Sequence, residues 1–481
     1  MLTGLHSPPY RVACECLLPQ VSIVSMIDRR RFLQILAAVA ATPAQAAVSN
    51  RAHGFGKLLA DKSRIIDLPV GFEYRIIARM GEEMTDGLLV PAEADGMAAF
   101  AGKNGRINLV CNHENSPGRQ YRGPFGSKLE RLDRILPKYI YDDGRGTTPG
   151  TGGTTTIIYD PVTGSKEGQF LSLAGTEFNC AGGATPWGSW LSCEETFSDP
   201  GRKIESAVPV QRNKRHGYVF EVSAHASGCI VPIALKDMGR FEHEAAAVDP
   251  SSGIVFLTED RHRSLFYRYL PNVPGQLHQG GRLQALAVKG HPGFDTRNWN
   301  EKSSMPADTW MDVEWLDLHD VDSDKNDLRL RGHDHGAARF ARGEGLCVAD
   351  SSIFITCTIG GPDRLGQIFE YRVSPLEGSD FESTKPGQIR LVAESTRDSV
   401  LRHADNITMS PWGDLLVCED TAGHCGLVGL KPDGTQYYIA DNAYTDSELA
   451  GVCFSPDGKT MFLNIQVQGL TLAINGPWAT R

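Results

Sequence analysis

Carboxylates and one thiol recur at two fixed places in a pattern that repeats along the chain. Each copy has a first residue that is polar in all but one copy, five mostly small or apolar residues, a turn with Pro or Asp and usually Gly, and an apolar run. The first place, six residues before the turn Pro or Asp, holds Cys180, Glu244, Glu344, Asp405 and Ala450. The second place, six residues after the turn glycine, holds Glu194, Glu259, Glu419 and Asn464. Carboxylates gathered at equivalent positions repel one another unless cations neutralise them, so the pattern indicates a metal cluster.

Each copy is typical of a strand, a tight turn and a second strand. A sixth copy, shifted by one residue, ends at Asn112, His113 and Glu114. Six copies between residues 47 and 481 leave more chain than the ~40–50 residues of a four-stranded blade, so loops must take up the excess. The clearest candidates for insertions are residues 115–155 and 271–340. We therefore predict an all-β fold, one six-bladed β-propeller domain over residues 47–481 with inserted loops and short helices; two β-sandwiches are the rival, but would not need six similar hairpins.

In a propeller, equivalent positions meet around the central axis, which would place the recurring acids in one channel. Several oxygen ligands favour calcium, whereas the thiol of Cys180 leaves room for iron or another transition metal. The alternative is that the acids only end strands and face solvent, but such an arrangement need not repeat in register. Arg342, two residues before Glu344, suits a phosphate-like oxyanion, and a salt bridge to the acid cluster is the open alternative.

The N-terminal segment is typical of an export signal. Arg29 and Arg30 precede a short apolar run over residues 35–41 and a small-x-small site at 44–46. The run is too short to cross a bilayer. We predict a twin-arginine signal over residues 1–46, recognised by the twin-arginine translocase, and a periplasmic or secreted mature protein without a membrane span. Met26 offers an alternative start, in which case residues 1–25 would not belong to the protein.

Charge, motifs and cysteine spacing exclude several classes of protein. The formal net charge is −10, which argues against a general nucleic-acid binder. The chain has no Gly-x-Ser-x-Gly elbow and no phosphate-binding P-loop motif. The cysteines after residue 46 are scattered along strand-like runs and do not form the spacing of a disulfide framework.

Several motifs together resemble those of the PhoX-type bacterial alkaline phosphatases. They include the twin-arginine signal, Asn112-His113-Glu114, Asn179-Cys180, Cys193-Glu194-Glu195, the run from Gly239 to Glu244, and Arg342-x-Glu344. The resemblance implies a six-bladed propeller whose central iron and calcium ions hydrolyse phosphate monoesters. It implies that Cys180, Glu244 and Glu344 bind iron (Fe³⁺), with Asn112, Glu114, Glu194 and Glu195 as further metal ligands. It also implies that Arg342 holds the phosphate beside Glu344.

The first hypothesis is therefore an exported, monomeric metal-dependent phosphatase that acts on a small phosphate ester. One alternative is a calcium-dependent propeller hydrolase of the lactonase type, in which the metal polarises a carbonyl. Cys180 argues against it, because a calcium site alone needs no thiolate. The other alternative is a non-catalytic propeller in which calcium serves only the structure.

Overall fold

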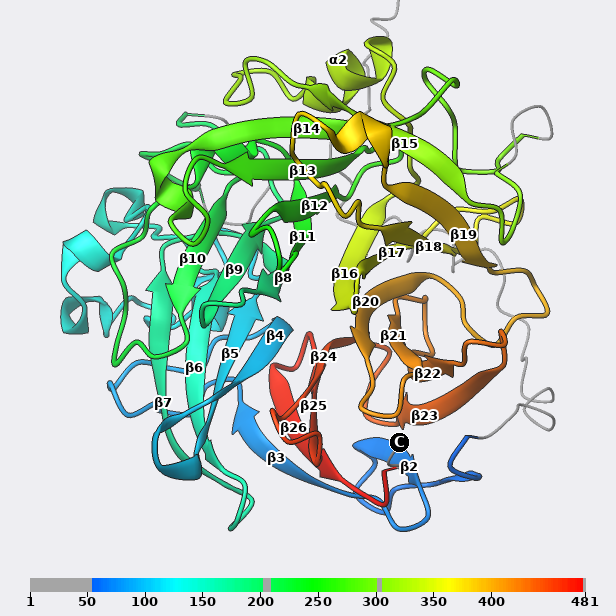
Figure 1. The fold of residues 1–481 in the computed structure, drawn as a ribbon. Coiled ribbons are helices and arrows are strands. Elements are labelled where there is room, and N and C mark those ends of the chain that lie inside the picture. Colours follow the sequence, from blue (N-terminus) through cyan, green and yellow to red (C-terminus); the bar gives the residue numbers. More distant parts are fainter. Residues whose placement is uncertain (1–53, 202–208, 301–304, 479–481) are drawn as a thin grey trace, which may run out of the picture. The chain divides into compact units, whose positions relative to one another are not determined.

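A computed structural model describes residues 54–201, 209–300 and 305–478. The expected export signal lies outside these residues. The described part is all-β with few helices (Figure 1). It contains one short α-helix, α2 (Leu328–Asp334), and short 3₁₀ helices at Lys103–Gly105, Gln120–Arg122, Leu132–Arg134, Pro137–Tyr139, Gly144–Gly146, Lys236–Met238, Leu277–Gln279 and Glu382–Thr384.

Two smaller sheets come from the first part of the described chain. The first has the order β4 (Ala94–Ala101), β5 (Ile107–His113), β6 (Gly153–Asp160), β7 (Ser165–Ala174). The second has the order β8 (Asn179–Ala184), β9 (Ser189–Glu194), β10 (Val219–Ser223). In both, neighbouring strands are antiparallel and follow one another in sequence, as the repeated hairpin pattern predicts.

A nine-stranded sheet follows. One half contains β11 (His243–Val248), β12 (Val255–Glu259), β13 (Phe266–Pro271), β14 (Gly281–Val288) and β15 (Met311–Asp317). The other half contains β16 (Gly343–Ala349), β17 (Ser352–Cys357), β18 (Gln367–Arg372) and β19 (Gln388–Glu394). The halves are joined where Met311 and Asp312 of β15 pair with Ile389 and Gln388 of β19. The described strands therefore form five hydrogen-bonded sheets, because this pairing merges two of the expected blades.

The last two sheets are completed by strands from the beginning of the described chain. One contains β20 (Ala404–Met409), β21 (Leu415–Glu419), β22 (Gly426–Leu430) and β23 (Gln436–Asn442), followed by β2 (Ile66–Pro69) and β1 (Leu58–Leu59). The other contains β24 (Leu449–Phe454), β25 (Thr460–Ile465), β26 (Leu470–Asn475) and β3 (Glu73–Arg79). The pairings β2–β23 and β3–β26 tie the two ends of the described chain together.

The first strands of the repeats lie next to one another. Among the described strands, β4, β8, β11, β16, β20 and β24 contact each other in this order, and β24 contacts β4 again. Figure 1 shows these strands around a common centre. The arrangement is propeller-like, with the sheets placed side by side and their first strands innermost.

The repeated turns have a conformational reason for their glycines. Gly188, Gly253, Gly413 and Gly458 all have positive φ, between 70° and 95°. A side chain at such a position is strained, so glycine is favoured. The copy that lacks the glycine turns at Asp350, with φ 52°, and Asp tolerates this region better than most residues.

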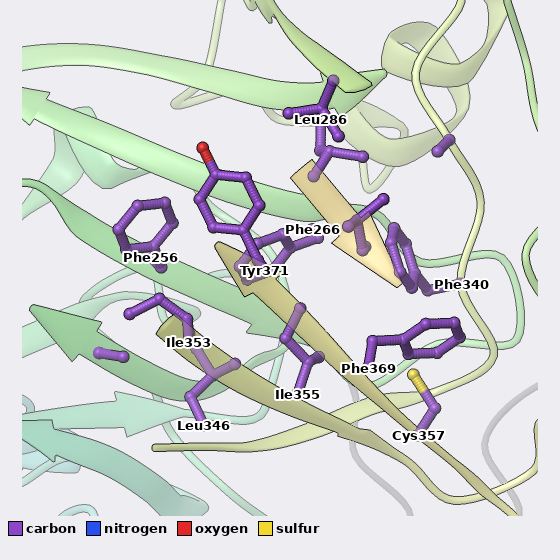
Figure 2. Packing of buried hydrophobic residues seen from close by; sticks show 14 of the residues in the cluster. Phe256, Phe266, Leu286, Phe340, Leu346, Ile353, Ile355, Cys357, Phe369 and Tyr371 are labelled. Atoms are coloured by element: carbon purple, nitrogen blue, oxygen red, sulfur yellow. The ribbon is translucent and has the colours of Figure 1, made fainter. Parts of the chain in front are cut away.

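The core lies between the faces of adjacent sheets. Its largest cluster joins the two halves of the nine-stranded sheet and includes Phe256, Phe266, Phe369 and Tyr371 (Figure 2). The strands bury both faces, which explains why they read as apolar runs rather than as alternating polar and apolar residues.

Candidate active site

In five of the six innermost strands, a β-bulge aims a side chain inward near the start of the strand. The register of β8 with β9 shifts between Asn179 and Gly182, which places Cys180 at the shift. The same shift occurs at Glu244 in β11, Glu344 in β16 and Asp405 in β20. A bulge leaves a residue out of the strand ladder and re-aims its side chain. The pattern's first position is therefore set by a repeated backbone irregularity.

The inward side chains form a continuous series of acidic groups. In each group, the ligand atoms lie within 4.8 Å of one another. Cys180 belongs to two groups, and so do Glu244 and Asp405, so each group shares a residue with the next. The four groups are Asp95–Glu114–Cys180, Cys180–Glu195–Glu244, Glu244–Glu344–Asp405 and Asp405–Asp420–Glu448. Such groups could hold several adjacent metal ions.

Three of these residues were missed in the sequence. Asp95 occupies the bulge of β4, between Ala94 and Met97, and is the counterpart of Cys180. The turn between β4 and β5 has no Pro-x-Gly signal. In this copy of the pattern, the sequence therefore revealed only the second strand, which carries Asn112. Asp420 directly follows Glu419, as Glu195 follows Glu194, so a shift of one residue in the second position would have found it. Glu448 directly precedes β24, in which Ala450 holds the first position of the repeated pattern. No feature of the pattern marks Glu448.

The structure places Asn112 beside the acidic series with its amide fully hydrogen-bonded. Its Nδ2 donates to the backbone oxygens of Cys180 (3.0 Å) and Ala181 (2.7 Å). Its Oδ1 accepts from Trp190 Nε1 (2.9 Å) and Ser192 Oγ (2.8 Å). These four bonds occupy two donors and two acceptor sites, the ordinary capacity of an amide side chain. Asn112 thus fixes the backbone that carries Cys180.

Glu194 has a comparable structural set of partners. It accepts from His216 Nδ1 (2.7 Å) and from the backbone nitrogens of Glu177, Gly217 and Tyr218. Its neighbour Glu195, which points the other way along the strand end, is the one that joins the acidic series. The alternation of side chains along an extended chain explains why consecutive acids have different surroundings.

Glu259 and Glu419 are also held outside the four acidic groups. Glu259 accepts from Tyr267 Oη (2.6 Å) and from Arg329 Nη1 (3.3 Å). Glu419 accepts from the backbone nitrogens of Arg402 (2.9 Å) and Gly426 (3.2 Å) and from Tyr438 Oη (3.3 Å). Burial raises the pKa of each carboxyl to about 7.

Arg342 stands beside the series and is fixed by two acids. Its Nε and Nη2 donate to Asp260 Oδ1 (2.7 Å) and Oδ2 (2.5 Å), a bidentate pair. Its Nη2 is also 3.3 Å from Glu344 Oε1, and Thr358 Oγ1 donates to the same oxygen at 2.6 Å. The bidentate pair fixes the plane of the guanidinium next to Glu344. This contact supports the salt-bridge alternative without excluding the oxyanion role, because a guanidinium has five N–H donors.

The thiol and carboxylates of the four acidic groups are suited to bind metal ions. Burial first, and then neighbouring carboxylates such as Asp95 and Glu244, raise the pKa of the Cys180 thiol well above its ordinary value. The thiol donates a hydrogen bond to Glu244 Oε1 at 3.1 Å. Buried acids at this density need a positive charge, and bound cations can replace protons on a thiol. The single charge of Arg342 does not neutralise the whole series.

A family model described as alkaline phosphatase PhoX matches residues 53–469. The chain belongs to the PhoX alkaline phosphatase family. The family resemblance expected from the motifs is thereby confirmed, and the protein is a phosphoric monoester hydrolase of this type.

One solved structure supports the fold. The chain is similar to Pseudomonas fluorescens PhoX in complex with vanadate, a transition-state analogue, with a TM-score of 0.60 and 17% identity over 88% of this chain and 98% of that one. A gluconolactonase from Xanthomonas campestris gives a TM-score of 0.39 and 11% identity, over 89% of this chain and 100% of that one. No curated protein sequence matches the chain. Among the described helices, none is long and apolar enough to cross a membrane.

Proposed function

We propose that this protein is an exported, metal-dependent phosphatase that hydrolyses phosphate monoesters at a central cluster of calcium and iron ions. The observation that carries the proposal is the continuous acidic series beside a fixed guanidinium, in a chain of the PhoX family. We further propose that residues 47–481 form one six-bladed propeller, each blade starting at one of the six innermost strands, after a signal over residues 1–46.

The two ends of the series differ in chemistry. The groups around Cys180 combine a thiol with carboxylates, a donor set that suits iron (Fe³⁺). The group Asp405–Asp420–Glu448 offers oxygen only, which suits calcium. Glu244 and Glu344 lie between them and belong to the group that joins the two ends. Bound metal ions would supply Lewis-acid stabilisation of the phosphate oxygens and of the charge that develops in the transition state.

The side chains of this protein would orient the substrate. Arg342 would bind phosphate oxygens with its planar guanidinium, held in place by Asp260. Thr358 fixes Glu344 through a 2.6 Å hydrogen bond, so the carboxylate nearest to Arg342 has a defined orientation. A positioned arginine next to a fixed carboxylate is the arrangement that favours one orientation of a phosphate ester over others.

Hydrolysis of p-nitrophenyl phosphate, measured with and without prolonged incubation in chelator, tests the activity. We expect chelation to remove activity and to lower the melting temperature together, because ions bound only to the native state stabilise it by mass action. Elemental analysis of the exported protein should find both iron and calcium. Activity that survives removal of all metal would refute the proposal, and calcium without iron and without phosphatase activity would favour the alternatives.

Export has a separate test. Replacement of Arg29 and Arg30 with Lys should retain the precursor in the cytoplasm, because the arginine pair is the recognised feature of such a signal. Normal periplasmic accumulation of the double variant would refute the twin-arginine assignment and leave the phosphatase proposal unaffected.

A further inference from the structure

Arg364 lies in the loop between β17 and β18, at the same end of the sheet as the acidic series. Gly343, which starts β16, pairs with Cys357, which ends β17. The loop that follows Cys357 therefore leaves the sheet beside Glu344. Its first residue, Thr358, bonds Glu344 through its side chain and the backbone oxygen of Arg342 through its nitrogen. Arg364 is exposed and six residues further along this loop.

The indole of Trp299 holds Arg364 in place. The guanidinium carbon of Arg364 lies 4.5 Å from the centre of the Trp299 ring, and that of Arg297 lies 4.1 Å from it. Trp299 Nε1 donates to the backbone oxygen of Ile359 at 2.7 Å, which ties the indole to the residue after Thr358. A cation stacked on an indole keeps its charge and loses part of its freedom to move. Arg364 is therefore an oriented cation on the loop that begins beside Glu344.

Two guanidinium groups, those of Arg297 and Arg364, stack on the Trp299 ring, but only that of Arg297 is paired with an acid. Arg297 is neutralised by Asp295, with which it forms a bidentate pair at 2.7 and 2.6 Å. Arg364 has no ion pair with an acid among the described residues, and its neighbour Asp363 pairs with Arg397 at 3.6 Å. A guanidinium held in place without an acidic partner can bind an anion.

We propose that Arg364, oriented by Trp299, binds a second phosphate group on the leaving group of the substrate, so that the enzyme prefers bisphosphorylated esters. The proposal rests on the proposed function, because it assumes that the scissile phosphate is held by Arg342. A phosphate dianion suits Arg364 better than a carboxylate, because it carries the larger charge and Arg binds phosphate with a fork of N–H donors.

The test compares fructose 1,6-bisphosphate with fructose 6-phosphate, which differ by the second phosphate. We expect Arg364→Ala to lower the ratio of kcat/KM for the bisphosphate to that for the monophosphate about tenfold, mainly through KM, the scale of one charge-assisted hydrogen bond. Trp299→Phe, which keeps an aromatic ring and loses the bond to Ile359, should lower the same ratio by a smaller factor.

Arg372→Ala is the matched control. Arg372 is also exposed and stacked on an indole, with its guanidinium carbon 3.8 Å from the ring of Trp310, but it ends β18, at the opposite end of the strand from the loop of Arg364. The ratio should stay at the wild-type value in this variant.

Two outcomes would overturn the inference alone: an unchanged ratio in Arg364→Ala, or an equal fall of the ratio in Arg372→Ala. 3-Phosphoglycerate and glycerol 3-phosphate form a second pair, in which only the first compound carries a carboxylate. If Arg364→Ala changes the ratio of kcat/KM for this pair and not for the fructose esters, Arg364 binds a carboxylate and the preference for a second phosphate is overturned. If the wild-type protein hydrolyses neither fructose ester nor p-nitrophenyl phosphate, the proposed function fails, and this inference fails with it.

Discussion

Replacing Asp260 with Asn should disable Arg342 without removing it. Asp260 accepts two hydrogen bonds from the Arg342 guanidinium, at 2.7 and 2.5 Å, and the two side chains are only 5% and 14% exposed. Asn retains one acceptor oxygen and loses the negative charge. Arg342 would then turn toward Glu344 Oε1, which is already 3.3 Å from its Nη2.

The size of the effect follows from the bond that is lost. A hydrogen bond between charged groups contributes about 1.5–3 kcal/mol, and each 1.4 kcal/mol corresponds to about a tenfold change. We therefore expect kcat/KM for p-nitrophenyl phosphate to fall about 10- to 100-fold in Asp260→Asn. The inhibition constant of inorganic phosphate should rise in parallel, because the same guanidinium would bind the product.

The control is Glu167→Gln. Glu167 forms a similar bidentate pair with Arg106, at 2.7 and 2.7 Å, on an exposed part of β7, and its loss should leave kcat/KM unchanged. Asp260→Glu, which keeps the charge, should recover part of the activity. Wild-type activity in Asp260→Asn would refute the reasoning, and a fall that occurs only together with loss of metal or a lower melting temperature would assign Asp260 to stability rather than to orientation.

Three further predictions concern buried groups. Cys180→Ser should lower the iron content and bleach any thiolate-to-iron absorption, whereas Cys193→Ser, in the core, should leave the absorption intact; full iron and full activity in Cys180→Ser would contradict the assignment. Asn112→Ala should lower the free energy of unfolding by about 3–5 kcal/mol in chemical denaturation, since several buried partners lose their hydrogen bonds at once; a loss below about 1 kcal/mol would contradict this. Because the pKa of Glu259 is raised from 4.5 to about 7, the native state favours its protonated form, so stability is greatest below pH 4.5 and is lost as the pH rises to 7. Glu259→Gln should therefore gain on the order of 3 kcal/mol relative to wild type between about pH 4.5 and 7.5, and a pH-independent difference would show that the carboxyl is not protonated in the native state.

The repeated pattern was sufficient to predict the class of fold and the inward position of Cys180, Glu244, Glu344 and Asp405. These four side chains lie in the acidic series because the same hairpin, with the same bulge, recurs in successive sheets. A local pattern predicts local geometry, and repetition carries that geometry to equivalent places around the centre.

Only the tertiary structure decided which of two consecutive acids joins the series. Glu194 and Glu195 are equivalent in composition and differ in where the strand end turns them. Asp95 and Glu448 join without a turn signal, because strands distant in sequence bring them to the same place. The pairing of β15 with β19, the two acids that hold Arg342, and the stacking of Arg364 on Trp299 also depend on contacts between distant segments. Such contacts are set by packing of the whole chain, and no spacing within a single repeat encodes them.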